Sequence, residues 1–210
     1  MCRILYVRSE NGIDISEYLR RFSEVALRSK EYQGHGWGCG YLVDGEWKVY
    51  RSIRPIWEDD LSVFGESTLL VAHARSAFRN EDIVVENTMP FEWNGYLFLF
   101  NGELHGVGVQ SEGRTGAAKI FQLIQRFYRG DMRLALQKAV NLLEKRTEYV
   151  KAMNILIVND DEGYLYSSFG EDAEYFQMEF CPGDVYVLCS DRWNEKDGWK
   201  SVGQKQVRVI

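Results

Sequence analysis

Apolar residues along the chain fall into short runs and into stretches with helical spacing. The run Ile4–Val7 is apolar and β-prone, which predicts a buried strand that begins almost at the terminus. Turn residues bound the other short runs, and hairpin turns are predicted at Asp44-Gly45 and Asn94-Gly95. The further strands predicted in this way span residues 41–43, 46–53, 68–74, 96–100, 154–158, 163–168, 175–179, 184–189 and 206–210.

Three stretches have apolar residues at helical spacing. Asp14, after a turn at Asn11-Gly12, can cap the first helix, and Thr115 can cap the second. Gly130-Asp131 separates the second helix from the third. Their apolar faces carry Ile15, Leu19, Phe22 and Ala26, then Ala117, Ile120, Phe121, Ile124 and Phe127, then Met132, Ala135, Leu136, Ala139 and Leu143. This content predicts one α+β domain over residues 1–210, with two sheets facing each other inside helical layers.

Composition narrows the class of protein. The net charge of −6 argues against nucleic acid or an anionic membrane as the partner. No apolar run approaches the roughly 20 residues that span a bilayer, and the N-terminus lacks a signal-peptide pattern, so we expect a cytoplasmic protein. The four cysteines lie far apart and the three histidines form no spaced ligand pair, so we expect reduced thiols, no metal site and no cofactor.

Polar groups at strand ends are the candidates for chemistry. Removal of Met1 would leave Cys2 with both a thiol and a free α-amine, which is a nucleophile carrying its own base. Arg75 follows an apolar strand and could grip a carboxylate, and Asn101 with the Gly102 N–H could stabilise an oxyanion. Each also has a plainer interpretation, namely a buried cysteine, a salt bridge at the rim and a β-turn.

The glycine-rich stretch 34–40 has two interpretations. Its glycines could cradle a phosphate, but no lysine motif follows them and the next element is a predicted strand. Close approach of the backbone in a β-hairpin accounts for them better.

The chain contains, in this order, Cys2, GHGWGCGYL at 34–42, AHARSA at 72–77, ENTMPF at 86–91 and FLFNGEL at 98–104. This series of motifs resembles the glutaminase domain of class II glutamine amidotransferases. The similarity continues to VLCSDRW at 187–193 and the terminal strand, and so spans the chain. It implies an N-terminal-nucleophile hydrolase with a four-layer αββα sandwich. It also implies that Cys2 attacks the glutamine side-chain amide, that Arg75 holds the substrate α-carboxylate, and that Asn101 and Gly102 form the oxyanion hole. Trp37 and Gly116 fall at positions that the resemblance assigns to substrate binding.

The chain departs from the family pattern at several positions. Phe100 and Met89 stand where the family usually has histidine, and His35 stands where it has an acidic residue. Gly116 replaces the aspartate that pairs with the glutamine α-ammonium. Glu103 or Glu112 are the nearby acids that could substitute for it.

These observations predict an amide hydrolase that releases ammonia from glutamine or a related γ-glutamyl amide through a thioester. Two alternatives stay open, which are an amidase for small amides without a free α-amine and a catalytically weak regulatory or binding subunit. The expected partners are a small-molecule amide and a synthetase or acceptor subunit, with no nucleic acid and no membrane.

Overall fold

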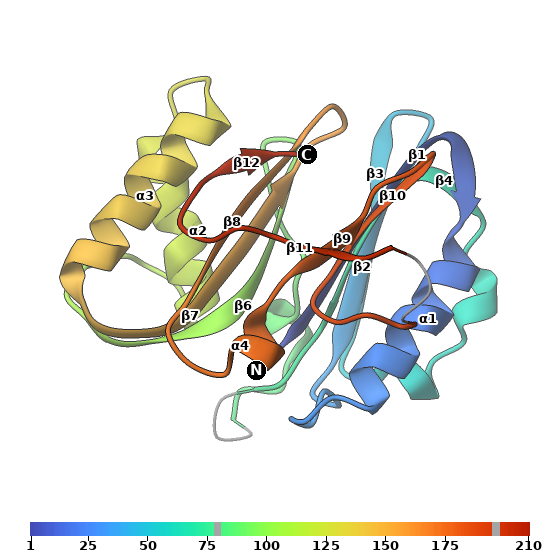
Figure 1. Ribbon diagram of the computed structural model, residues 1–210, viewed down its shortest axis with the longest axis horizontal. Helices are drawn as coiled ribbons and strands as arrows, with labels where there is room; N and C mark the ends of the chain where they lie inside the picture. The colour runs from blue at the N-terminus through green and yellow to red at the C-terminus, as the bar shows by residue number, and fades with distance from the viewer. Residues whose placement is uncertain (78–80, 195–197) are drawn as a thin grey trace. The chain divides into compact units, whose positions relative to one another are not determined.

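The computed structural model describes residues 1–77, 81–194 and 198–210 and divides into two compact units. Unit 1 comprises Met1–Pro90 and Gln177–Val202, and unit 2 comprises Phe91–Phe176 and Gly203–Ile210. Each unit contains one antiparallel sheet with its own helices (Figure 1), which confirms the α+β class. The description of residues 1–210 as a single domain stays a prediction.

The sheet of unit 1 has seven strands in the order β11-β9-β10-β1-β4-β2-β3. The N-terminal strand β1 lies in the interior of this sheet, between β10 and β4, so the predicted terminal strand is confirmed. The strands are β1 Arg3–Asp14, β2 Trp37–Val43, β3 Glu46–Ser52, β4 Glu66–Ala74, β9 Glu179–Cys181, β10 Val185–Cys189 and β11 Lys200–Ser201. Short 3₁₀ turns follow β3 and precede β5, namely η1 Ile56–Glu58, η2 Leu61–Val63 and η4 Val85–Asn87.

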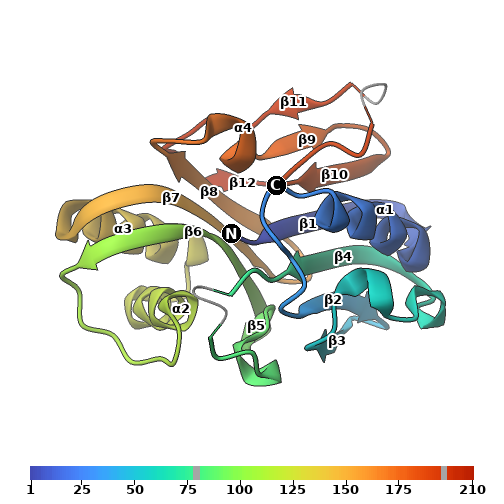
Figure 2. The same cartoon turned by 90° about the horizontal axis from the view of Figure 1, so that it is seen from below.

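Helix α1, Ile15–Leu27, covers one face of this sheet (Figure 2). Its predicted cap is confirmed, because the Asp14 carboxylate accepts a hydrogen bond from the Ser16 N–H at 2.8 Å. Leu19 and Phe22 are fully buried in a core with residues of β1, β2, β4 and β10. Burial of one such side chain stabilises the fold by about 1.5–3 kcal/mol. The packing of α1 therefore stabilises the sheet whose strand β1 follows Cys2.

The sheet of unit 2 has five strands in the order β12-β8-β7-β6-β5. They are β5 Phe91–Trp93, β6 Tyr96–Val107, β7 Thr147–Val158, β8 Gly163–Phe169 and β12 Arg208–Val209. Helices α2, Gly116–Phe127, and α3, Met132–Arg146, pack side by side against this sheet (Figures 1 and 2). The rings of Phe98 on β6 and Phe121 on α2 stack with centroids 4.6 Å apart.

Two local predictions away from the candidate site residues are wrong. Asn11-Gly12 does not end β1, because the strand continues through a bulge at which Gly12 has φ +82° and pairing resumes at Ile13 opposite Ser67. The segment 175–179 is not a continuous strand, since helix α4, Ala173–Phe176, includes its first two residues and β9 begins only at Glu179. Asp172 has φ +48° and its carbonyl accepts the N–H groups of residues 175 and 176, which turns the chain into a helical conformation.

None of the helices in the described ranges is both long enough and apolar enough to cross a membrane.

Candidate active site

The register of three strands brings the N-terminus and Arg75 to the same end of the unit 1 sheet. Arg3 on β1 pairs with Ala74 on β4, and Ala74 also pairs with Trp37 on β2. The ladder continues past the strands, because the Arg75 N–H donates to the Gly36 carbonyl at 2.8 Å. The residues directly beyond these three paired positions are Cys2, Arg75 and Gly36, so they lie together at one end of the strands.

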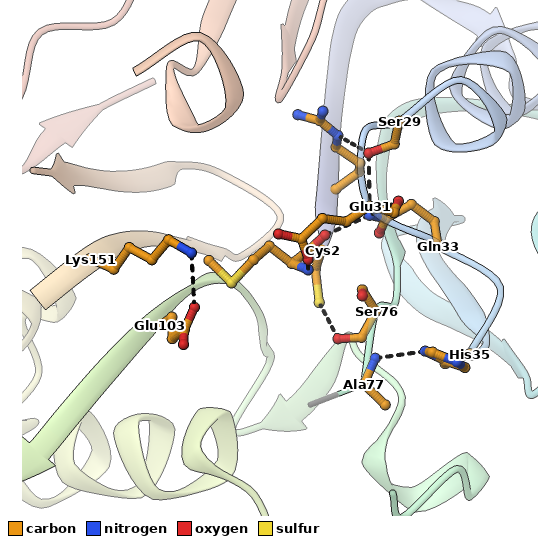
Figure 3. A network of polar contacts seen from close by, with 11 residues as sticks. Cys2, Ser29, Glu31, Gln33, His35, Ser76, Ala77, Glu103 and Lys151 are labelled. Atoms are coloured by element: carbon orange, nitrogen blue, oxygen red, sulfur yellow. Dashed lines mark hydrogen bonds and ion pairs between the residues drawn. The ribbon is translucent and has the colours of Figure 1, made fainter. Parts of the chain in front are cut away.

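The Cys2 thiol lies at this end of the sheet, with its Sγ 3.8 Å from the Ser76 carbonyl oxygen, to which it donates (Figure 3). Burial raises the pKa of this thiol, while the nearby N-terminal ammonium and the Arg75 guanidinium lower it and the Glu31 carboxylate raises it. The structure therefore places Cys2 and Arg75 within electrostatic reach of each other.

Arg75 is buried, and its guanidinium is only partly engaged. Nη2 donates to the Asp82 carbonyl at 3.0 Å, whereas Nη1 is buried without a hydrogen-bond partner among the described residues. Burial lowers the pKa of Arg75, and the neighbouring Cys2 and Asp82 oppose that change. A buried cationic donor with no acceptor is costly, so Nη1 is suited to an anionic ligand.

The Asp82 carbonyl holds Arg75 in place. This oxygen also accepts from the Asn87 side-chain amide at 3.0 Å and from the Val84 N–H at 2.9 Å. Sequence reasoning missed both Asp82 and Asn87, although Asn87 is the asparagine of the ENTMPF segment and could have been singled out there.

His35 braces the same region. Its Nδ1 accepts from the Ala77 N–H at 2.9 Å (Figure 3). Its backbone N–H donates to the Arg75 carbonyl at 3.1 Å. Burial, with the Arg75 charge and the N-terminal ammonium, lowers the pKa of His35. A neutral imidazole therefore stands where the family pattern has an acid.

Trp37 lies in the core. Its side chain is fully buried, its indole N–H donates to the Asp59 carboxylate at 2.9 Å, and its ring contacts those of Tyr50 and Phe64. These are core contacts, and a role of Trp37 in substrate binding stays a prediction.

Close backbone approach explains Gly38 in the glycine-rich stretch. A Cβ at this position would lie 2.5 Å from the Met89 carbonyl oxygen and 2.8 Å from the Tyr50 carbonyl oxygen. The interpretation of these glycines by backbone approach is therefore supported at Gly38.

Asn101 and Gly102 belong to unit 2 and lie inside β6, so the prediction that the strand ends there is wrong. They pair with Asn154 and Met153 of β7, and β6 runs on to Val107 because pairing with β7 continues. Strand β5 pairs with β6 only as far as Phe98, and no described strand covers that edge of β6 beyond it.

The Asn101 side chain is fully buried, and neither its oxygen nor its nitrogen has a hydrogen-bond partner among the described residues. Buried amides are normally paired, so an exception calls for an explanation such as a catalytic role. Gly102 has a packing role as well, because a Cβ there would lie 2.3 Å from the Ala152 carbonyl oxygen.

Gly116 is the first residue of α2, and the Thr115 hydroxyl caps the helix by accepting from the Ala118 N–H at 3.2 Å. The first turn of α2 carries no acidic residue. Glu103 is already paired with Lys151 at 3.4 Å and with His105 at 2.8 Å. Glu112 accepts from Gln122, which lies six residues, or about 9 Å, along the helix from Gly116.

Glu31 and Gln33, which sequence reasoning also missed, contact the N-terminal residue directly (Figure 3). They lie in an irregular segment after α1 that carries no motif. Within the described ranges, no group of three or more histidine, cysteine or acidic side chains could hold a metal ion.

No protein-family model and no curated protein matches the chain. Several solved structures match its whole length. A glutamine phosphoribosylpyrophosphate amidotransferase from B. subtilis has 16% identity and a TM-score of 0.69, and this chain covers 47% of it. A glutamine aminotransferase class-II domain protein from Silicibacter pomeroyi has 16% identity and a TM-score of 0.64, with 98% of its length covered.

A third structure, named as a predicted glutamine amidotransferase from Pseudomonas aeruginosa, has 13% identity and a TM-score of 0.58 over 99% of this chain and 92% of its own. The chain thus spans about half of the first enzyme (47%) and nearly all of the other two proteins. These matches confirm the fold class predicted from the sequence. The chain has the fold of the class II glutamine amidotransferases.

Proposed function

We propose that the protein is an amide hydrolase of the class II glutamine amidotransferase type, acting on glutamine or a related γ-glutamyl amide. The observation that carries this proposal is the Cys2 thiol beside the buried Arg75 guanidinium, whose Nη1 has no partner among the described residues. A nucleophile next to an anion-binding group fits a substrate that has both an amide and a carboxylate.

In the proposed reaction, Met1 is first removed and Cys2 becomes the N-terminal residue. Its α-amine takes the thiol proton, and Sγ attacks the side-chain amide carbon to give a tetrahedral intermediate. The resulting ammonium returns the proton to the amide nitrogen, so that the C–N bond breaks, ammonia leaves and a thioester remains. Water then attacks the thioester, which releases the carboxylic acid and restores the thiol.

Arg75 is proposed to bind the substrate carboxylate through Nη1. Its second nitrogen, Nη2, is committed to the Asp82 carbonyl, which fixes the plane of the guanidinium before substrate arrives. Pre-orientation of this kind lowers the entropy lost on binding.

Asn101 and Gly102 are proposed as donors to the oxyanion, from the side-chain amide and the backbone N–H respectively. Support for this role comes from the resemblance and from the buried Asn101 amide, which makes no hydrogen bond to the described residues. A donor already held in a dry position needs no reorganisation when the oxyanion forms.

A second candidate substrate class is favoured by the start of α2. The first turn of this helix has no acid at Gly116, Glu103 is already paired with Lys151 and His105, and Glu112 is bound farther along the helix. A helix N-terminus carries partial positive charge and disfavours an ammonium. Gly116 therefore supports amides whose α-amine is acylated or absent.

The acceptor of ammonia is open in this proposal. The B. subtilis structure is a phosphoribosylpyrophosphate amidotransferase of which this chain covers 47%. By analogy, a synthetase or acceptor partner could receive the ammonia, and without one the protein would act as a simple amidase.

The test is treatment with 6-diazo-5-oxo-norleucine, a glutamine-derived electrophile, followed by intact mass measurement and an ammonia assay with glutamine and glutaramate. We expect one adduct on a chain that begins at Cys2, and loss of both adduct and ammonia release in Cys2→Ala.

Cys181→Ala is the matched control, since Cys181 is a partly exposed thiol elsewhere in unit 1. It should behave as wild type. If the wild-type protein neither reacts nor releases ammonia from any γ-glutamyl amide, the enzymatic proposal fails and the regulatory or binding role replaces it.

A further inference from the structure

The segment that follows α1 is fastened to the start of β1 by side-chain hydrogen bonds (Figure 3). The Arg3 guanidinium donates through Nε to the Ser29 hydroxyl at 3.1 Å. The Gln33 amide, which is fully buried, donates to the same hydroxyl at 3.3 Å and to the Glu31 carbonyl at 2.9 Å. None of these three bonds involves Met1, so this anchoring would survive removal of Met1.

This segment already binds an α-amine. The ammonium of Met1 forms an ion pair with the Glu31 carboxylate, and the Met1 carbonyl accepts from the Gln33 amide at 2.5 Å. Glu31 therefore acts as a carboxylate partner for the positive charge directly ahead of Cys2.

We infer that Glu31 is a positioning residue that binds and orients the α-ammonium of Cys2 once Met1 has been removed. The inference rests on the proposed function. The two amines are one residue, about 3.8 Å, apart along the chain. The Glu31 side chain is 40% exposed and can rotate over that distance, while its backbone stays fixed by Gln33.

The charges around this amine in unit 1 give Glu31 a distinct task. Arg75 at the end of β4 is a cation beside the Cys2 thiol, and His35 ahead of β2 is affected by both Arg75 and the N-terminal charge. Arg75 disfavours an ammonium nearby, and Glu31 is the carboxylate that offsets it. Glu31 thus offers the amine a negatively charged partner beside the thiol.

The sign of the effect is the same for either ionising group. A carboxylate favours the ammonium form of the amine and disfavours the thiolate, so it raises both pKa values. Removal of its charge in Glu31→Gln should therefore shift the rise of reactivity to lower pH. We expect a shift of about 0.5–1 pH unit, which is below the 1–3 units of close pairs because Glu31 is partly exposed.

The experiment measures the rate of Cys2 alkylation by iodoacetamide between about pH 6 and pH 9, by mass spectrometry of the N-terminal peptide. This probe has no α-amine or carboxylate, so it reports the ionisation at Cys2 and not substrate recognition. The pH profile of kcat/KM for the amide that is hydrolysed gives a second reading.

Three variants accompany the wild type. Glu31→Gln should shift the rising limb to lower pH and lower kcat several-fold, because the amine loses its partner. Glu31→Asp keeps the charge and should restore most of the wild-type profile. Glu46→Gln removes one surface charge, paired with Lys48 at 3.3 Å, at the far end of the β2–β3 hairpin and should leave the profile unchanged.

Superimposable profiles of wild type and Glu31→Gln, in protein that starts at Cys2 and is active, would overturn this inference and leave the proposed function standing. A wild-type protein that retains Met1 or is inactive would overturn the proposed function, and this inference with it.

Discussion

Asn101 and Asn154 lie opposite each other on β6 and β7 and are both fully buried, yet their hydrogen bonding differs. The Asn154 amide donates to the Phe176 carbonyl at 2.9 Å, and its oxygen accepts from the Ser167 hydroxyl at 2.6 Å. The Asn101 amide has no partner among the described residues. One amide holds structure together, and the other is available to bind a group that the fold does not supply.

Asn101→Ala should lower kcat by roughly 10²–10³ if the amide donates to an oxyanion. The thermal stability should stay the same or rise, because the substitution removes a buried amide that makes no bond to the described residues. Steady-state kinetics and a melting curve on the same preparation check both parts.

Asn154→Ala is the matched comparison. It leaves the Ser167 hydroxyl and the Phe176 carbonyl without their partner, so it should reduce stability by about 1–3 kcal/mol while kcat changes little. If Asn101→Ala turns over substrate at the wild-type rate in a well-folded protein, Asn101 is not an oxyanion donor.

Arg75→Lys should raise KM far more than it lowers kcat. An ammonium keeps the positive charge, but it cannot hold the Asp82 carbonyl and a substrate carboxylate at once with the planar geometry of guanidinium. The measurement is kcat and KM for carboxylate-bearing amides, with Arg51→Lys as the control. Arg51 also donates to a backbone carbonyl, that of Pro90, at 2.9 Å.

An unchanged KM for every carboxylate-bearing amide would remove Arg75 from the site.

Sequence order identified Cys2 and Arg75 as candidates because each stands in a motif. The residues that surround them were not predictable in this way. Asp82 acts through its backbone carbonyl, which has no sequence signature, and Glu31 reaches the N-terminus across 30 positions of the chain. The contact between Glu31 and the N-terminus depends on the path of the chain after α1, which the sequence pattern does not predict.

At the scale of elements, the start of α2 is the proposed contact region for the substrate amine. Gly116 does not need glycine, since its φ lies outside the positive range and an added Cβ would meet nothing within 4 Å. Gly116→Asp should therefore fold, and an acid in the first turn also favours the helix electrostatically.

If the absent carboxylate limits the use of free glutamine, Gly116→Asp should raise kcat/KM for glutamine about tenfold or more, the value of one charge-assisted contact. For glutaramate, which has no α-amine, it should change little. Gly116→Asn is the control, because it has the same shape without the charge. Efficient turnover of free glutamine by the wild-type protein would refute the preference for substrates without an α-amine.

The elements themselves were predicted well where amphipathic spacing is long, as in α1, α2 and α3. Prediction was poorer where polar or glycine residues occur within a strand. Asn101-Gly102 is a typical turn pair in sequence, yet β6 continues because β7 supplies hydrogen bonds across it. The aromatic pair Tyr175-Phe176 is typical of a strand, but the carbonyl of Asp172 caps a short helical turn there.

At the scale of the whole molecule, the proposed roles divide between the two compact units. Cys2 and Arg75 belong to unit 1, and Asn101 and Gly102 belong to unit 2. All of them depend on one covalent event, the removal of Met1, because only then does Cys2 have an α-amine. In the chain that retains Met1, the Met1 ammonium is paired with the Glu31 carboxylate, and the Met1 side chain is 10% exposed.

A cleavable leader fused directly ahead of Cys2 tests this dependence. Before cleavage, the Cys2 nitrogen is an amide and cannot accept the thiol proton, so we expect amide hydrolysis to be absent although the thiol is present. Cleavage that leaves Cys2 as the first residue should switch on hydrolysis without a change in secondary structure by circular dichroism. A leader that ends in Met1 and resists cleavage serves as the control, since it passes through the same protease treatment. Equal turnover before and after cleavage would show that the α-amine is not the base, and the proposed mechanism would then have to draw its base from another residue.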